Sequence, residues 1–292
     1  MRGPFDFIAA LKLAAYAREV KADTLCPQFP RENYISVFAS KLCGAKVIYT
    51  SHVYIKDAFW RRIINKILTR NVLLIAVCKD IERQAKENGY KKSVVIYNGA
   101  PKANLSVAPA PPPFIFVSLM RLSEEKGVFF LLEAIEILAK KTEFIFFIAG
   151  SGPLEEQAKE RAIGLPVKFL GQIKNPEEIL SKAHCYINSS KSEALSLAIL
   201  EALAHGLPII ATRVGGNPEI IDIIGRGFLV DYGDSNALSD AMLNATRLSE
   251  SERTEYKKAA LKAVEKTFEF KKFIKAHINL YKKTRRSGYF YF

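Results

Sequence analysis

Two glutamates stand out in a segment of small and apolar residues, which runs SSKSEALSLAILEALAHGLPIIATRVGGNPE over residues 189–219. The pattern predicts a helix that continues through Ala204 and is ended by the glycine and proline that follow. Glu193 and Glu201 would then lie roughly 12 Å apart along this helix. A carboxylate buried among the apolar neighbours of Glu201 costs several kcal/mol unless it is paired. The two glutamates therefore predict a site that holds a hydroxyl-rich ligand at two distances.

The small residues near the start of this helix suggest what the middle of the ligand could be. Ala194 and Ser196 leave backbone N–H groups near the helix start uncovered. Such N–H groups and the helix dipole favour a phosphate group. The segment therefore predicts phosphates in the centre of the ligand and hydroxyl groups at both of its ends.

Two cations follow a predicted strand over residues 114–119. Arg121 and Lys126 lie in the sequence SLMRLSEEKG, at a strand-to-helix turn. Arginine grips phosphate through a two-pronged contact and lysine as a point charge. The alternative is a solvated loop in which Glu124 and Glu125 pair with the two cations.

Two further turns hold residues that suit a ligand or a helix start. Gly150 and Gly152, in IAGSGPL, permit close approach of a backbone to a ligand, although a tight turn by itself explains them better. Pro153 is suited to the first position of the next helix. In RVGGNPE, Asn217 is expected to cap a helix that has Pro218 at its first position.

Short apolar runs alternate with helical patterns along the whole chain, which predicts parallel sheets covered on both faces by helices. We therefore expect an α/β protein with two doubly wound, Rossmann-like domains. The expected boundaries are an N-terminal domain over 1–100, a Pro-rich linker over 101–113, a C-terminal domain over 114–270 and a basic helix or tail over 271–292. The expected strands are 23–26, 46–50, 72–77, 93–97, 114–119, 144–149, 167–170, 185–188, 208–211 and 228–230.

The first domain is expected to be short, with about four strands and no Gly-rich turn after an N-terminal strand. His52 follows the strand at 46–50, at the end of a strand where parallel sheets bind ligands. A polar histidine in an ordinary loop explains the same spacing.

The charge of the chain is strongly positive. Its 43 Lys and Arg against 30 Asp and Glu give a net charge of +13. This excess suggests an anionic partner such as phospholipid headgroups, a phosphorylated carrier or nucleic acid, although general solubility explains it as well. Residues 56–70 predict a basic amphipathic helix suited to a membrane surface, with a helix packed on its sheet as the alternative. No apolar run is long enough to span a bilayer, and we expect no signal peptide.

Several of these segments together resemble glycosyltransferase family 4, the retaining nucleotide-sugar transferases of GT-B fold. The likeness covers about residues 20–245 and is carried by RLSEEKGV, IAGSGPL, FLGQI and SEALSLAILEALAHGLPIIATRVGGNPEII. The segment VVIYNGA is similar to the end of the family's N-terminal domain. Family members usually begin with a strand and a Gly-rich loop, and this chain differs from them there.

The resemblance implies a role for each matched residue. Arg121 and Lys126 would neutralise the donor diphosphate, Glu193 would contact sugar hydroxyls, and His52 would lie near the reaction centre. The leaving diphosphate would help to deprotonate the acceptor on the same face of the sugar, which gives retention. No cofactor or metal is implied, because arginine and lysine can replace the cation. The implied donor-binding residues are Gly150, Gly152, Gly171, Ile173, Lys174, Ala194, Leu195, Ser196, Leu197 and Glu201.

The resemblance thus implies a transferase that moves a sugar from a nucleotide-sugar donor to a lipid-linked or cell-surface polysaccharide acceptor. Its place would be cytoplasmic, with peripheral contact to the inner face of the cell membrane through residues 56–70 and the basic tail as a further option. One alternative is a nucleotide-sugar epimerase of the same fold. Another is an inactive or split donor-binding subunit, for which a partner chain supplies the missing N-terminal half. Nucleic acid is not expected as a partner, because the chain has no recognisable motif for it.

Overall fold

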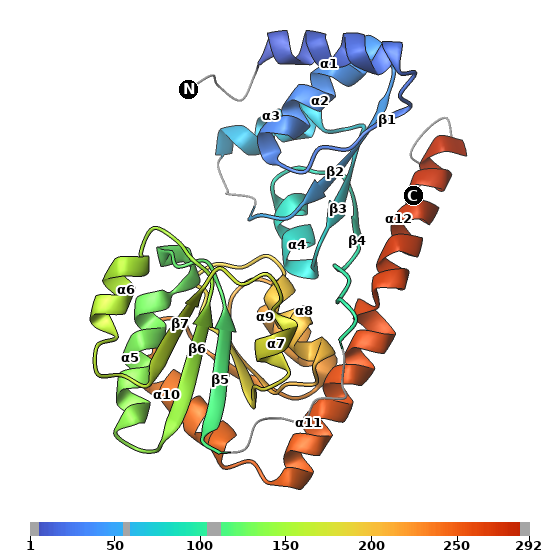
Figure 1. Ribbon diagram of the computed structural model, residues 1–292. Coiled ribbons are helices and arrows are strands. Elements are labelled where there is room, and N and C mark those ends of the chain that lie inside the picture. Colours follow the sequence, from blue (N-terminus) through green and yellow to red (C-terminus); the bar gives the residue numbers. More distant parts are fainter. Residues whose placement is uncertain (1–5, 55–58, 104–111, 287–292) are drawn as a thin grey trace. The chain divides into compact units, whose positions relative to one another are not determined.

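The chain folds into two α/β units, each built on a parallel sheet (Figure 1). The computed structural model describes residues 6–54, 59–103 and 112–286. The first unit combines Met1–Asn98 with Phe273–Phe292, and the second is Gly99–Lys272. Most of the expected linker, residues 104–111, lies outside the described residues.

The first unit has a parallel sheet of strand order β1-β2-β3-β4. Strands β2 and β3 are almost wholly buried, as expected for continuous apolar runs such as VLLIA. The elements of this unit are α1 (Phe7–Glu19), β1 (Thr24–Leu25), α2 (Pro30–Cys43), β2 (Lys46–Ser51), α3 (Phe59–Leu68), β3 (Val72–Ala76), α4 (Lys79–Glu87), β4 (Lys92–Val95) and the part of α12 (Phe270–Arg286) that begins at Phe273.

Helix α12 closes the core of this first sheet. Leu280 packs in one cluster with Ile48, Leu73 and Ile75, which come from β2 and β3. Lys46 at the start of β2 also donates a hydrogen bond to the backbone carbonyl of Thr284. The helical part of the basic C-terminal segment is thus a structural element of the first unit from Phe273 on.

Helix α1 buries only a narrow alanine stripe. Ala14 and Ala17 pack with Leu25 and with α2, so the two helices approach closely. A face of α1 next to this stripe is apolar and exposed: Phe7, whose ring centre lies 5.1 Å from that of Phe38 on α2, is 59% exposed, and Ile8 is 61% exposed. This face of the first unit is therefore unlike an ordinary solvated helix surface.

The second unit has a sheet of strand order β10-β9-β8-β5-β6-β7, all parallel. This is the doubly wound order, whose direction reverses between β5 and β8, and ligands bind beyond the carboxyl ends of strands at such a point. Its elements are β5 (Phe114–Leu119), η1 (Glu124–Lys126), α5 (Val128–Ala139), β6 (Phe144–Ala149), α6 (Glu155–Arg161), β7 (Val167–Gly171), α7 (Glu177–Leu180), β8 (Cys185–Asn188), α8 (Leu197–Ala204), β9 (Ile209–Thr212), α9 (Asn217–Ile224), β10 (Phe228–Val230), α10 (Ser235–Thr246), α11 (Glu250–Ala263), the π-helical turn η2 (Val264–Phe268) and the start of α12.

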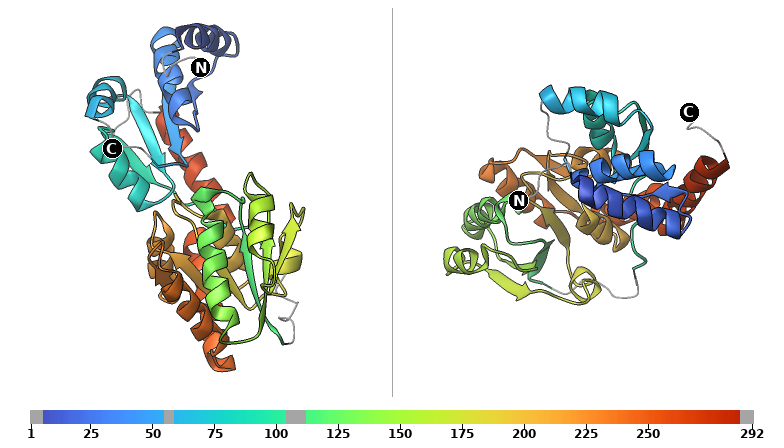
Figure 2. Two further views of the ribbon diagram at one scale, coloured as in Figure 1. Left: turned by 90° about the vertical axis from the view of Figure 1, so that its left-hand side faces the viewer. Right: turned by 90° about the horizontal axis from the view of Figure 1, so that it is seen from above.

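Helices cover both faces of this second sheet. Helix α5 lies beside α10 on one face, and α8 and α9 contact α11 on the other (Figure 2). Buried residues such as Phe116, Phe146 and Leu131 fill the core between the sheet and α5. The expected α/β class with two Rossmann-like parallel sheets is confirmed. Within the described ranges, no helix is both long and apolar enough to cross a bilayer.

Candidate functional site

A cleft of about 780 Å³ opens beyond the carboxyl ends of β5, β6 and β7 in the second unit. Five residues that the sequence analysis singled out line it: Arg121, Gly150, Gly152, Ile173 and Glu201. Pro153, which was expected only to start a helix, also lines it, and the remaining lining residues are Leu119, Met120, Ala149, Ser151, Gln172 and Pro176.

Arg121 is an exposed cation without a protein partner at this cleft. It follows the end of β5, and among the described residues it forms no ion pair or hydrogen bond. An arginine that lines a cleft without a carboxylate partner leaves its two-pronged donor group for an anion. The alternative, in which Arg121 pairs with Glu124 or Glu125, is not seen among the described residues.

The two glycines of the β6–α6 turn allow two loops to touch. A Cβ atom at Gly150 would lie 1.9 Å from the carbonyl oxygen of Met120, and one at Gly152 would lie 2.3 Å from that of Leu122. The Gly150 N–H also donates to the carbonyl oxygen of Gly171, at 2.7 Å. The glycines thus join the loops after β5, β6 and β7 at the rim of the cleft. Their first role is close packing of backbone on backbone.

Pro153 was expected at the first position of the following helix, and this is wrong. Helix α6 begins at Glu155, with Leu154 as its N-cap, so Pro153 lies in the turn before it. The Leu154 N–H donates to the Leu122 carbonyl oxygen at 3.1 Å. That contact with the neighbouring loop delays the start of the helix.

Helix α8 starts later than the sequence suggests. Ser196 is its N-cap, and the Ser196 Oγ accepts a hydrogen bond from the Ile199 N–H at 3.3 Å. Glu193 therefore lies in the loop before the helix, and only Glu201 is helical. The expected spacing of the two carboxylates along one helix is wrong, because the serines before Glu193 bond to neighbouring loops instead.

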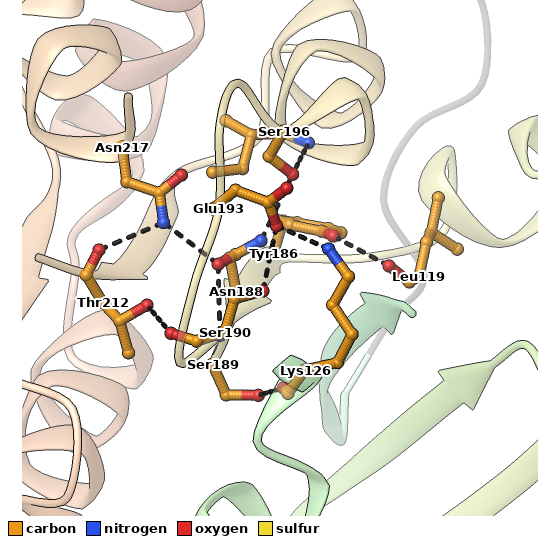
Figure 3. A network of polar contacts seen from close by, with 11 residues as sticks. Leu119, Lys126, Tyr186, Asn188, Ser189, Ser190, Glu193, Ser196, Thr212 and Asn217 are labelled. Carbon is orange, nitrogen blue, oxygen red and sulfur yellow. Dashed lines mark hydrogen bonds and ion pairs between the residues drawn. The ribbon is translucent and has the colours of Figure 1, made fainter. Parts of the chain in front are cut away.

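Glu193 forms an ion pair with Lys126 in a polar network beside the cleft (Figure 3). The Lys126 Nζ lies 2.6 Å from the Glu193 Oε2, and the Ser190 Oγ donates to the same oxygen at 3.0 Å. The side chain of Glu193 is 12% exposed and that of Lys126 is 30% exposed. The pair joins the β5–α5 loop to the β8–α8 loop, and neither residue lines the cleft itself.

A layer of buried polar side chains supports these loops from below. The Asn217 Nδ2 donates to the Asn188 Oδ1 and to the Thr212 carbonyl oxygen, both at 3.1 Å. The Thr212 Oγ1 donates to the Ser190 carbonyl oxygen at 2.6 Å. Asn217 was expected to cap helix α9, and this is wrong. It is the first residue of α9, Gly216 is the N-cap, and the Asn217 side chain turns to the strand ends instead.

Asn188 and Thr212 were not predicted as site residues from the sequence. Both are the last residues of apolar strands, β8 and β9, and both are buried. A polar residue that ends a buried strand needs a hydrogen-bond partner, and this was the signal that could have found them.

Two more glycines make this loop assembly possible. A Cβ atom at Gly127 would lie 2.1 Å from the Ser189 carbonyl oxygen, and one at Gly215 would lie 1.5 Å from that of Glu193. Both glycines have a positive φ, of 67° and 53°. The loops after β5 and β9 therefore both press on the loop that carries Glu193.

Unbonded backbone donors lie at the start of α8. In the described part of the chain, the N–H groups of Leu195, Ser196 and Leu197 donate no hydrogen bond to the protein. Ala194 and Leu195 are buried, whereas the Leu197 side chain is 54% exposed. Free N–H groups at the start of an eight-residue helix suit an anion.

Glu201 is a half-buried carboxylate on the wall of the cleft. Burial raises its pKa above the ordinary value, and the nearby charge of His205 lowers it to a smaller extent. Tyr186, a buried residue of β8, donates a hydrogen bond to the Leu119 carbonyl oxygen at 3.3 Å. Burial chiefly raises the pKa of Tyr186, and the charges of Glu193 and Glu201 add to that effect.

The loop after β7 contributes one of its predicted residues to the cleft. Gly171 ends the strand with a φ of 62°, and Ile173 lines the cleft together with Gln172. Lys174 is exposed and is not among the lining residues.

His52 belongs to the first unit, where it follows the end of β2. Its Nε2 lies 2.9 Å from the Gln28 Oε1. Removal of water by neighbouring atoms lowers the pKa of His52, and the charge of His277 on α12 lowers it further. The ring is thus held mainly neutral near pH 7.

The arrangement in the second unit can bind an anion that carries hydroxyl groups. Arg121 and the free N–H groups before α8 provide donors for phosphate oxygens, and Glu201 provides an acceptor for hydroxyls. The described residues contain no group of three or more His, Cys, Asp and Glu that could hold a metal ion.

Most of the second unit matches a known protein family. A model of the family described as Glycosyl transferases group 1 matches residues 111–247. The matched segment contains β5 to β10 and the loops around the cleft.

Relatives match over a longer stretch. A human protein, named as one of the subunits of phosphatidylinositol N-acetylglucosaminyltransferase, is 28% identical over 207 residues, which are 64% of this chain and 42% of that protein. The Arabidopsis thaliana protein of the same name is 31% identical over 202 residues, which are 62% of this chain and 45% of that protein. This chain thus spans less than half the length of these two relatives.

Solved structures share the fold. A glycosyltransferase from Rickettsia africae has a TM-score of 0.85 and 19% identity, over 98% of this chain and 84% of that one. The Anabaena protein Alr3699/HepE in complex with UDP has a TM-score of 0.80 and 19% identity, over 94% and 82% of the two chains. The fold is therefore that of the GT-B glycosyltransferases.

Proposed function

We propose that the cleft of the second unit binds a nucleoside diphosphate-sugar, and that the chain transfers its sugar, with retention, to a lipid-linked or cell-surface glycan acceptor. One observation carries this proposal. An arginine that has no partner among the described residues and a half-buried glutamate line the same cleft, at the switch point of a doubly wound sheet. The UDP present in the Anabaena neighbour of the same fold supports the choice of ligand.

The diphosphate is the part of the donor that needs cations. In our proposal Arg121 binds it with two donors, and the free N–H groups of Leu195, Ser196 and Leu197 bind its other oxygens. Lys126 is held by Glu193 and adds its charge from beside the cleft. These donors stabilise the negative charge that grows on the diphosphate as the sugar leaves, and in our proposal they take the place of a metal ion.

The hydroxyl groups of the donor are assigned to the two glutamates. Glu201 accepts hydrogen bonds from the ribose hydroxyls, and Glu193 contacts the sugar. Ile173 and Gln172 lie beside the base of the donor. Lys174 is the next residue after Ile173, and we assign it to the same end of the donor. Because burial raises the pKa of Glu201, two ribose hydroxyls that donate to the carboxylate would favour its charged form again.

The transfer itself needs one proton to move. The bond between the anomeric carbon and the diphosphate oxygen breaks, and the acceptor oxygen bonds to the same carbon on the same face. The proton of the acceptor hydroxyl passes to the leaving diphosphate. We assign His52, held mainly neutral, to the acceptor side near the reaction centre.

Calorimetric titration tests the donor site. The full chain is titrated with ribonucleoside diphosphates and with the matching 2′-deoxyribonucleoside diphosphates. Glu201→Ala should weaken ribonucleotide binding by about 10- to 100-fold, the loss of one or two hydrogen bonds to a charged group, and should remove the preference over the deoxy form. Arg121→Ala should weaken diphosphates far more than free nucleosides.

Lys182→Ala provides the control, because Lys182 is exposed and lies outside the lining of the cleft. It should bind like the parent. If no nucleoside diphosphate binds, or if Glu201→Ala binds both sugar forms as the parent does, the donor site is not where we place it. Assays of sugar transfer with the nucleotides that bind then separate a transferase from an epimerase, which acts without an acceptor.

We also propose that the first unit touches an anionic membrane through α3. This helix buries Asn65, which accepts a hydrogen bond from Tyr34 at 2.8 Å, and leaves Ile67 65% exposed. Arg62 and Lys66 are exposed on the same helix. An exposed isoleucine between cations is typical of a helix that lies in a membrane interface. Residues 55–58 and 287–292, part of the expected membrane contact, lie outside the described residues.

Vesicle sedimentation tests this contact. Ile67→Glu should reduce binding to phosphatidylglycerol vesicles, whereas Ile163→Glu, at an exposed isoleucine of the second unit, should not. Equal binding by Ile67→Glu and the parent would remove α3 from the membrane contact. Cys26, Cys43, Cys78 and Cys185 are all free thiols, which supports a reducing compartment and so the inner face of the membrane.

A second candidate is a donor-binding protein that works only with a partner chain. The exposed apolar face of α1, with Phe7, Ile8 and Leu11, favours it, because large apolar patches mark protein contacts. The human relative is itself named as one component of its enzyme. Nucleotide binding without transfer by this chain, and transfer after a partner polypeptide is added, would favour this candidate.

A further inference from the structure

A second hollow in the second unit is strongly basic. It has a volume of about 320 Å³ and lies between the end of α9 and the helix α11–η2. Four cations line it, Arg226, Lys258, Lys262 and Lys266, with Glu255 as the one carboxylate among its lining residues. It shares no lining residue with the donor cleft.

The hollow lies away from the donor cleft. Helix α9 begins directly after the loop that follows β9, on the side of the donor cleft, and ends at Ile224, which lines the hollow. Eight residues of helix separate these two ends by roughly 12 Å. A ligand in the hollow would therefore not be the donor nucleotide.

The positive charges that line the hollow outnumber the carboxylates that pair with them among the described residues. Glu255 lies 3.3 Å from the Lys258 Nζ and 3.8 Å from the Arg226 guanidinium. In the described part of the chain, the ammonium groups of Lys262 and Lys266 form no ion pair or hydrogen bond. The hollow therefore keeps an excess of positive charge.

The spacing of the lysines makes this excess unfavourable for the helix alone. Lys258, Lys262 and Lys266 follow one another at intervals of four residues, so they repeat along one side of α11 and η2. Like charges at this spacing destabilise a helix. The ends of α9 and α11 favour a cation each, but Lys258 lies a full turn before the end of α11 and Lys266 lies beyond it. The helix dipoles thus do not explain the whole set.

The geometry of the helix also departs from the ordinary where it lines the hollow. Residues Val264–Phe268 form a π-helical turn, and Lys266 and Thr267 of this turn line the hollow. Such turns are rare and are frequent at functional sites. Arg226 lines the hollow as well. Its guanidinium carbon lies 5.9 Å from the centre of the Tyr256 ring, a cation–π contact that holds the guanidinium in position.

From these observations we propose that the hollow between α9 and α11–η2 binds a phosphorylated anion. Lysine and arginine offer donors only, so the ligand must be rich in acceptors and must carry negative charge. Phosphate groups meet both conditions, with Arg226 as a fork and the lysines as point charges. The source is either a soluble phosphorylated molecule or the headgroup of an anionic lipid.

Titration with inorganic pyrophosphate tests the site. All proteins in this experiment carry Arg121→Ala, so that the donor cleft contributes little to the pyrophosphate binding that is measured. Adding Lys262→Ala and Lys266→Ala should weaken pyrophosphate binding about tenfold. Adding Lys168→Ala and Lys182→Ala instead removes the same charge at exposed positions outside the hollow, and it should leave binding within about twofold.

Vesicles distinguish the two sources. In a chain with Ile67→Glu, which removes the proposed α3 contact, binding to phosphatidylcholine vesicles with and without a phosphoinositide is compared. A loss of phosphoinositide binding with Lys262→Ala and Lys266→Ala assigns the site to a lipid headgroup. Pyrophosphate binding that these lysines control, without such a loss, assigns it to a soluble anion.

The proposal is overturned if the hollow variant and the charge-matched control weaken pyrophosphate and vesicle binding equally, or if neither probe binds. Thermal unfolding of the variants shows whether they remain folded, which is expected because all four lysines are exposed. This test can fail without affecting the proposed donor site, and the reverse also holds. Nucleotide binding in a chain with an intact Arg121 should be unchanged by Lys262→Ala and Lys266→Ala.

Discussion

Single side chains decide how the loops around the donor cleft are held. Thr212 is wholly buried, and its hydroxyl reaches the Ser190 carbonyl oxygen at 2.6 Å. Ser190 in turn holds the Glu193 carboxylate. A hydroxyl group that reaches Lys126 through three successive contacts therefore helps to fix the position of its charge.

Thr212→Val should lower the free energy of unfolding by about 1–2 kcal/mol, because the Ser190 carbonyl oxygen loses a buried donor while the shape of the side chain is kept. Urea unfolding measures this change. Thr254→Val, at an exposed helical position of α11, is the matched control and should cost less than about 0.5 kcal/mol. Equal losses in the two variants would show that the buried hydrogen bond does not stabilise the loops.

Glu201 should make stability depend on pH. Because burial raises its pKa in the folded state, the folded protein holds this proton more tightly than the unfolded chain does. The charged carboxylate is therefore destabilising above its folded pKa, and that cost disappears below the unfolded value of about 4.3. Glu201→Gln should raise the free energy of unfolding at neutral pH and not in acid. Urea unfolding of both chains across this range, without nucleotide, measures the difference, and a constant difference at all pH values would contradict the assignment.

At the scale of elements, the site depends on loops that approach more closely than side chains allow. Gly215 shows this best, since its missing Cβ leaves room for the Glu193 carbonyl oxygen. Gly215 precedes helix α9, and Gly225 directly follows it. Gly225 also has a positive φ, of 72°, but a Cβ atom there would meet open space.

Gly215→Ala should therefore destabilise the second unit more than Gly225→Ala does. Both variants lose about 1–2 kcal/mol from the left-handed backbone. Gly215→Ala must also displace the loop that carries Glu193, at an added cost of about 1–3 kcal/mol, and should weaken nucleotide binding. Urea unfolding and calorimetry measure the two effects. Similar results for both alanine variants would mean that the loop contact is easily relaxed.

The elements were more predictable from sequence than the contacts between loops. The run VLLIA is buried at every position, so its composition alone marks it as a strand of a parallel sheet. The start of α8 was missed because several serines before it are suitable N-caps. Contacts distant in sequence decide among them, since Ser189 bonds to Lys126 and Thr212 bonds to Ser190. Local patterns do not contain such contacts.

At the scale of the whole molecule, α12 links the end of the described chain to its beginning. Leu280 packs against Ile48, Leu73 and Ile75 of the first sheet. Ile278 of the same helix is 45% exposed. Comparing alanine substitutions at Leu280 and Ile278 therefore distinguishes the loss of core packing from a change in helix propensity.

Leu280→Ala should destabilise the first unit by about 2–4 kcal/mol, the cost of a cavity in a packed core. Ile278→Ala should cost less than about 1 kcal/mol, because little of this side chain is buried. Thermal unfolding followed by circular dichroism measures both. A small loss for Leu280→Ala would mean that the first sheet is stable without α12.

The order in which the ribosome makes the chain gives this helix a further consequence. The strands that contact Leu280 emerge first, and residues 99–272 must follow before α12 does. At about 5–20 residues per second, this delay lasts roughly 10 to 35 seconds. During synthesis one face of the first sheet stays without its helix, while the second unit already has its whole sequence. The second unit should therefore be able to fold before the first unit is complete. Until α12 is made, the first sheet exposes an apolar face to chaperones.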